Sequence, residues 1–167
     1  MSASDHHPFL HPTRIDIPLE IRLHLITLLN QTLACTVDLR SQVKQASWNA
    51  RGKDRSQLQA LFDSIATELD AYADLLAERL VVLGGVALGT ARTAAAQSTL
   101  PEYPGDIAAG DAHVQTLAER FAPYNAAMRD AIVHAADVGD AGTAAVYTDI
   151  TRGVDKRLQV LEAYLHR

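Results

Sequence analysis

Cysteine, long apolar runs and positive charge are all scarce in this chain of 167 residues, and each shortage excludes a class of protein. The single cysteine, Cys35, cannot form a disulfide within the chain, and its place in a helical pattern predicts a buried structural thiol. No run of about 18 apolar residues is present, so we expect no segment that spans a membrane. The formal net charge of −5 argues against a protein body built to bind nucleic acid.

The first residues predict a flexible tail, 1–15, ahead of a single domain at 16–167. The tail has no basic segment followed by an apolar core, so we expect no secretory signal and a cytoplasmic location. It carries His6, His7 and His11, and imidazole is a common ligand of transition metals. Two interpretations stay open for these histidines: a metal site on the tail, or a disordered tail or remnant of cloning.

Apolar side chains recur at helical spacing through most of the chain, and no strand pattern, repeat or low-complexity tract interrupts them. Leu25, Leu29 and Leu33, spaced four apart, form one stripe that would face a core. Hydrophobic residues make up 48% of the sequence, which is enough to build that core. The pattern predicts an all-α protein with long helices at about 18–47, 56–83, 107–137 and 142–166.

The connection between the second and third predicted helices, about 84–105, is the longest in the chain. Gly84 and Gly85 would end the second helix, and Thr90 would cap a short helix that reaches about Gln97. A connection of this length lets the two helices that it joins run parallel. The sequence therefore predicts a four-helix bundle with one long crossover connection containing a short helix, rather than an up-down-up-down bundle.

Carboxylates recur at fixed spacings along the second predicted helix. Asp74 and Glu78 are four residues apart and share a face, and Asp63 lies three helical turns earlier on nearly the same face. At a rise of about 1.5 Å per residue, Asp63 and Asp74 are roughly 16 Å apart, too far for one ion to bind both. A shared metal would need the second half of its site from another copy across a two-fold axis. The alternative is a solvated acidic face.

The stretch that holds these carboxylates resembles the signature of the Dps family, the small ferritin-like cage proteins. The family pattern begins Lys-Gln-Ala-His-Trp-Asn, and this chain has Lys-Gln-Ala-Ser-Trp-Asn at 44–49. The resemblance extends over nearly the whole chain after about residue 14, and it implies the ferritin-like form of the four-helix bundle. Further matches are an Arg-Gly turn at 51–52, Leu-Gln-Ala-Leu-Phe-Asp at 58–63, Ala-Glu-Arg at 77–79 and Leu-Gly-Gly-Val-Ala-Leu-Gly-Thr at 83–90.

The resemblance implies an iron-oxidising centre that two subunits share. One subunit supplies two histidines and an aspartate, which matches Asp63, and the other supplies an aspartate and a glutamate, which match Asp74 and Glu78. The two histidines fall on Ser47 and Gln59, whose neutral oxygens are weak ligands for iron(II). We therefore expect a ferroxidase centre of these five residues that binds iron weakly and oxidises it slowly. Its oxygen-rich ligand set would favour other divalent ions, such as Mg²⁺ or Ca²⁺, more than the family's centre does.

The resemblance also assigns two features outside the ligand set. Trp48 lies beside the centre in the family and would quench radicals there, with plain packing at the interface as the alternative. An acidic pore at a three-fold axis, through which iron reaches the cage, maps to the end of the third predicted helix. Asp130, His134 and Asp137 recur there at i, i+4 and i+7, and Asp140 follows in the turn. Rings of carboxylates concentrate cations, although the same pattern also suits an exposed helix face.

Three functions stay open at this point. The first is a dodecameric mini-ferritin that binds, oxidises and stores iron, which detoxifies it under oxidative stress, with an atypical ferroxidase centre. The second is a non-catalytic cage for metal buffering or structure. The third is a DNA-protecting protein, which we disfavour because DNA-binding relatives carry lysine-rich tails and this tail offers only Arg14. Little DNA binding is expected at neutral pH, with some permitted below about pH 6 if the tail histidines become charged.

Overall fold

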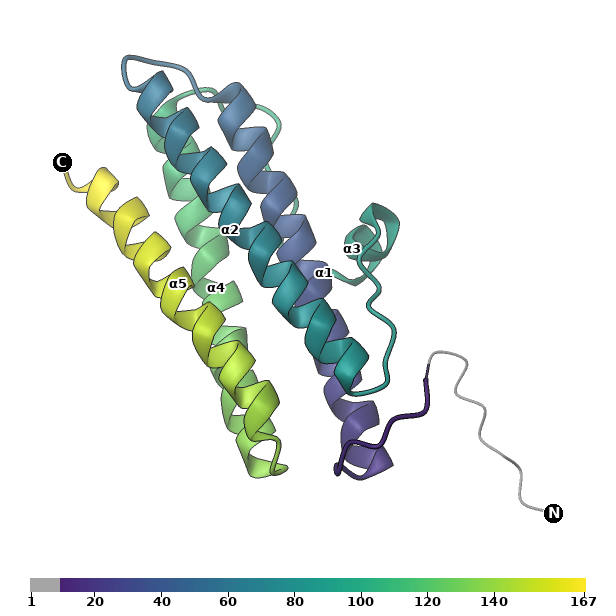
Figure 1. The fold of residues 1–167 in the computed structure, drawn as a ribbon. Coiled ribbons are helices and arrows are strands. Elements are labelled where there is room, and N and C mark those ends of the chain that lie inside the picture. The colour runs from purple at the N-terminus through teal and green to yellow at the C-terminus, as the bar shows by residue number, and fades with distance from the viewer. Residues whose placement is uncertain (1–9) are drawn as a thin grey trace.

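The computed structural model describes residues 10–167, and most of this part of the chain is helical. The helices are α1 (Leu19–Asn49), α2 (Arg55–Val82), α3 (Ala91–Gln97), α4 (Gly110–Asp137) and α5 (Ala141–Leu165). Figure 1 shows the four long helices as a bundle, with the short α3 on the outside next to α1. Apart from isolated bridges between Leu10 and Gly85 and between Arg51 and Ala109, the described residues contain no strand pairing. The predicted all-α four-helix bundle with a short extra helix is confirmed.

Two helix starts differ from the prediction for reasons that lie in the backbone. Ser56, expected to cap the second helix, already lies in its first turn, and Asp54 precedes the helix without a side-chain cap bond. The third long helix begins at Gly110 rather than at about 107. The Arg51 N–H donates to the Ala108 carbonyl oxygen (2.9 Å), and the Gly110 N–H donates back to the Arg51 carbonyl oxygen (3.1 Å). This pairing holds the residues before Gly110 in an extended path.

The crossover connects α2 and α4 so that both helices run in the same direction, from the upper to the lower end in Figure 1. Gly84 makes the turn after α2 with φ of +86°, where a Cβ would lie 2.6 Å from the His11 carbonyl oxygen. Only glycine fits this position without strain. Thr90 caps α3 as predicted, because its hydroxyl accepts a hydrogen bond from the Thr93 N–H (3.3 Å).

Buried tyrosines of α4 and α5 fix the packing of these helices against α1. The Tyr124 hydroxyl is hydrogen-bonded to Thr36 (2.7 Å), and the Tyr147 hydroxyl to Thr32 (2.8 Å). Burial raises the pKa of both phenols, so they stay neutral hydrogen-bonding groups. Each pair satisfies a polar group that would otherwise be stranded in the core. Both tyrosines belong to the core cluster, which also contains Leu25 and Leu29 of the predicted stripe together with Phe62, Leu117 and Ile150.

Two expectations drawn from composition can be compared with the structure. Cys35 is a free thiol with only 7% of its surface exposed, as predicted, and its sulfur accepts a hydrogen bond from the Thr99 N–H (3.5 Å). That contact ties the crossover to α1. Within residues 10–167, no helix has both the length and the apolar character needed to cross a membrane.

The described part of the predicted tail lies against the end of α2. The His11 N–H donates to the Gly84 carbonyl oxygen (2.6 Å), and Ile15 packs against the core. The His11 side chain is exposed. His6 and His7, the other two candidate ligands of the tail, lie outside the described residues, so a metal site on the tail stays a prediction.

Candidate metal centre

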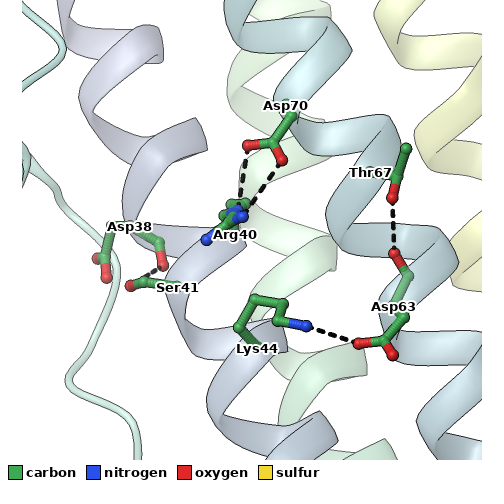
Figure 2. Close-up of polar contacts among 7 residues, drawn as sticks. All are labelled: Asp38, Arg40, Ser41, Lys44, Asp63, Thr67 and Asp70. Atoms are coloured by element: carbon green, nitrogen blue, oxygen red, sulfur yellow. Dashed lines mark hydrogen bonds and ion pairs between the residues drawn. The ribbon is translucent and has the colours of Figure 1, made fainter.

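Asp63 of α2 is the candidate ligand with contacts inside the subunit, because two side chains of α1 bond to its carboxylate. One of its carboxylate oxygens accepts hydrogen bonds from the Lys44 ammonium (2.8 Å) and from the Ser47 hydroxyl (2.8 Å). Figure 2 shows the Lys44 side chain extending from α1 toward Asp63 on α2. It also shows the hydrogen bond that the Thr67 hydroxyl donates to the backbone carbonyl oxygen of Asp63 (3.0 Å). Asp63 is therefore held by charge and hydrogen bonding within one subunit.

These contacts determine the protonation state of Asp63. The hydrogen bond from Lys44 is the main cause that lowers the pKa of Asp63 below its ordinary value, and the hydrogen bond from Ser47 is the second. Desolvation raises the pKa by a smaller amount. The carboxylate is thus ionised at neutral pH, as a metal ligand must be. Its charge is also already balanced by an ammonium, so a metal ion would have to displace Lys44 or share the carboxylate with it.

The two positions that resemblance assigns to histidine lie close to Asp63 but differ in setting. Ser47 is buried, with 2% of its surface exposed, and its hydroxyl donates a hydrogen bond to the Asp63 carboxylate. Gln59 is exposed on α2, one helical turn before Asp63. Neither side chain offers a nitrogen lone pair, so this half of the centre has one anionic ligand and two neutral oxygen donors.

The other half of the predicted centre is on the same helix but farther along it. Asp74 and Glu78 are both exposed and lie one turn apart on α2, as their spacing predicted. Among the residues that the structure describes, no three His, Cys, Asp or Glu side chains come together in a way that could hold an ion. Asp63 and the Asp74–Glu78 pair can therefore meet only if a second copy of the chain brings its own α2 alongside.

Trp48 lies next to the candidate centre on the surface of α1. The indole is 67% exposed, and the Lys44 ammonium lies 5.8 Å from its ring centroid. α2 also exposes Leu75, Val81 and Val82, by 39%, 63% and 48%. Within one subunit, α1 and α2 thus leave these large apolar side chains exposed to solvent.

The four predicted pore residues are not equivalent in the structure. Asp130 and Asp137 are exposed on α4, and His134 between them is half-buried against His24 of α1. Asp140 differs, because its side chain is only 2% exposed and belongs to the subunit interior. Within the subunit it is a helix cap and an ion-pair partner, not a member of the exposed face.

Asp140 has three donors around it. Its carboxylate accepts hydrogen bonds from the N–H of Thr143 (3.0 Å), from the Thr143 hydroxyl, and from the Arg79 guanidinium (2.7 Å). Desolvation on its own would raise the pKa of Asp140, but the Thr143 and Arg79 hydrogen bonds together hold it below the ordinary value. The carboxylate thus ties the first turn of α5 to α2.

Two contacts near the candidate residues were not foreseen from the sequence. The sequence gives Lys44 only as the first residue of the family signature, and the pairing of its ammonium with Asp63 depends on how α1 and α2 face each other. No motif includes His24, yet its ring centroid lies 4.6 Å from that of His134. No local spacing signals that contact, because the two histidines are far apart in the chain.

Comparison with known proteins agrees with this fold. The model of the ferritin-like domain matches residues 26–167. The DNA protection during starvation protein of Agrobacterium fabrum is 37% identical, over 93% of this chain and 96% of its own length. General stress protein 20U of Bacillus subtilis is 27% identical, over 84% of this chain and 97% of its own.

Solved structures of Dps proteins have the same fold as this chain. DpsC from Streptomyces coelicolor superposes with a TM-score of 0.90 at 26% identity, covering 98% of this chain and 96% of that one. The Dps protein of Vibrio cholerae, described as a ferritin-like diiron-carboxylate protein, has a TM-score of 0.87 at 26% identity and covers 93% and 98%. With a matching domain model, a relative at 37% identity and these structures, this chain belongs to the Dps family of ferritin-like proteins.

Proposed function

We propose that this protein is a mini-ferritin of the cytoplasm: a closed dodecamer that binds and stores iron, with ferroxidase centres that two copies share and that oxidise iron slowly. In this proposal Asp63, Ser47 and Gln59 of one copy face Asp74 and Glu78 of another. The observation that carries it is the arrangement on α2, where Asp63 points to α1 while Asp74 and Glu78 lie exposed farther along the same helix. Membership of a diiron-carboxylate family supports iron as the cargo.

The split of the ligands supports a two-fold contact between copies. An isologous interface places residue i of one copy against residue j of the other and also j against i, so one contact would build two identical centres. Trp48 and Leu75, both exposed, lie on the face where this contact would form. Light scattering is the direct check on assembly, and a stable monomer of 18.1 kDa at micromolar concentration would contradict the proposal.

Slow oxidation follows from the chemistry of the donors. Imidazole matches iron(II) better than a hydroxyl or an amide oxygen does, so Ser47 and Gln59 should leave the ion more hydrated and more weakly held. Lys44 should weaken iron binding further, because its ammonium already neutralises Asp63 and repels a cation placed there. Glu78 and Asp74 of the second copy would then supply most of the binding.

The test is the rate of Fe²⁺ oxidation by peroxide in four full-length proteins. The Ser47→His/Gln59→His double variant should oxidise iron faster than the native protein, and Glu78→Ala should remove most of the native rate. Glu162→Ala, which deletes an exposed glutamate of α5, is the matched control and should leave the rate unchanged. A rapid native rate that Glu78→Ala does not alter would place the working site elsewhere, and the histidines at His6, His7 and His11 would be examined next.

A non-catalytic cage is the second candidate, and the Lys44–Asp63 ion pair is the observation in its favour. Such a cage would bind divalent metal at the shared site, including Mg²⁺ or Ca²⁺, without oxidising iron. Peroxide would then oxidise no Fe²⁺ in the native protein or in Glu78→Ala, while the double histidine variant would gain this activity.

DNA protection is what the name of the Agrobacterium fabrum relative describes. Binding of DNA by this chain would show as a salt-sensitive gel shift, and we expect little binding at pH 7.5.

A further inference from the structure

Two histidines from distant parts of the sequence meet at one end of the bundle. His24 lies near the beginning of α1 and His134 near the end of α4, and these two helix ends lie together at the lower end of Figure 1. Their ring centroids are 4.6 Å apart and their planes are tilted by 48°. Both residues belong to one subunit, so the pair does not depend on the assembly of a cage.

One of the two rings has a nitrogen without a partner. The Nε2 atom of His134 is shielded from solvent, and no hydrogen bond to it is found in the described part of the chain. A shielded polar atom without a partner loses the hydrogen bond that it would make to water. His24, by contrast, is exposed. The unsatisfied nitrogen thus belongs to a ring that packs against a second, exposed imidazole.

The geometry of the pair suits coordination to one ion. With metal–nitrogen bonds of about 2.0–2.1 Å, two imidazoles on adjacent positions of one metal have ring centroids roughly 4.5–5.2 Å apart. The observed separation of 4.6 Å falls in this range. The tilt matters as well, because the in-plane lone pairs of two parallel stacked rings cannot converge on a single point, whereas those of tilted rings can.

We infer that His24 and His134 form a two-imidazole site for a divalent transition-metal ion within each subunit. Neutral imidazoles select ions such as Zn²⁺, Co²⁺, Ni²⁺ and Cu²⁺ over Mg²⁺ and Ca²⁺. Two protein ligands leave the remaining positions to water or a carboxylate. Asp130 and Asp137 supply nearby negative charge, since they lie four residues before and three after His134 on the same face of α4.

This site is separate from the centre proposed at Asp63, Asp74 and Glu78. It uses α1 and α4 instead of α1 and α2, and its donors are nitrogens instead of oxygens. It also needs no second copy of the chain. Its failure would leave the shared iron centre untouched, and the failure of the shared centre would leave this site in place.

The experiment uses Zn²⁺ as the probe and the full-length chain with the tail histidines replaced (His6→Ala, His7→Ala and His11→Ala), so that they cannot contribute. Zinc binding is measured by isothermal titration at neutral pH. His24→Ala added to this background should weaken or abolish one zinc site per subunit, by at least tenfold in affinity. His166→Ala, which removes an exposed histidine just after α5, is the matched control and should change nothing.

His134 is tested with two variants, since alanine at a half-buried position could disturb the packing of α4. His134→Gln keeps most of the side-chain volume and should lose the same zinc site as His24→Ala does. Crystals soaked in Zn²⁺ should give an anomalous scattering peak between the two rings, which Glu78→Ala leaves in place. Zinc titrations that are unchanged by His24→Ala, or saturated crystals without that peak, would overturn the inference.

Discussion

Replacing Lys44 by methionine removes the ammonium from Asp63 while keeping a long unbranched side chain. In the native subunit the ammonium donates to the carboxylate at 2.8 Å, and the two side chains are 24% and 45% exposed. If a divalent ion binds Asp63, the ammonium is a neighbouring positive charge that opposes it. The variant should therefore bind divalent metal more tightly than the native protein does.

The size of the effect follows from Coulomb's law. Two unit charges at 4 Å interact by about 1 kcal/mol in water and by about 4 kcal/mol at an effective dielectric constant of 20. Because both side chains are partly exposed, we take the value for water as the lower limit, and a double charge on the metal then gives about 2 kcal/mol of repulsion. Since 1.4 kcal/mol is a factor of ten, we expect Lys44→Met to raise metal affinity about 30-fold.

Mn²⁺ titrations of the assembled protein measure this affinity without oxidation of the metal. Lys156→Met, which removes an exposed lysine of α5, is the control for the change in total charge. Emission from Trp48, the single tryptophan of the chain, gives a second readout because its ring lies 5.8 Å from the Lys44 ammonium. An affinity in Lys44→Met within twofold of the native value would refute the idea that Lys44 competes with metal at Asp63.

The remaining predictions concern stability and the route of iron. Because Asp63 has a lowered pKa, its contribution to stability is present above the ordinary carboxylate pKa and lost as pH falls through the lowered value. In metal-free protein, the difference in unfolding free energy between native and Lys44→Met should thus be present at pH 7 and vanish at strongly acidic pH. Asp140→Ala should cost about 3–5 kcal/mol in denaturant unfolding, because it strands the Arg79 guanidinium, which is 16% exposed. Asp140→Asn should cost less, since its amide oxygen still caps α5. Asp130→Asn with Asp137→Asn should slow iron loading and leave assembly intact, and unchanged loading would mean that iron enters elsewhere.

The helices could be predicted from the sequence because their signal is repeated many times. Stripes such as Leu25, Leu29 and Leu33 occur on every long helix, and all three of these side chains are buried. The start of α4 could not be predicted in the same way. It depends on a backbone pairing between Arg51 and Ala108, residues that lie in different connections and carry no local signal of their contact.

Asp140 shows how two local signals can overlap at one residue. The resemblance assigns it to the pore, where it follows Asp137 in the turn after the helix. Gly139, with φ of +84°, turns the chain at that point and ends the helical register. Aspartate three residues before Thr143 at the start of a helix is also a capping pattern, and the structure has that cap. Within the subunit Asp140 serves as this cap, and its place in a pore stays a prediction.

The Lys44–Asp63 pair bears on assembly as well as on metal binding. In the proposed two-fold contact, Asp63 of one copy meets Asp74 and Glu78 of the other, and three carboxylates without a cation would repel one another. A metal ion could balance that charge, but a centre without imidazoles holds metal only weakly. Lys44 supplies a permanent positive charge at the same place, bonded to Asp63 at 2.8 Å. In the proposed function the interface would then form before any iron is bound, and the same charge that is expected to slow iron oxidation would stabilise the cage.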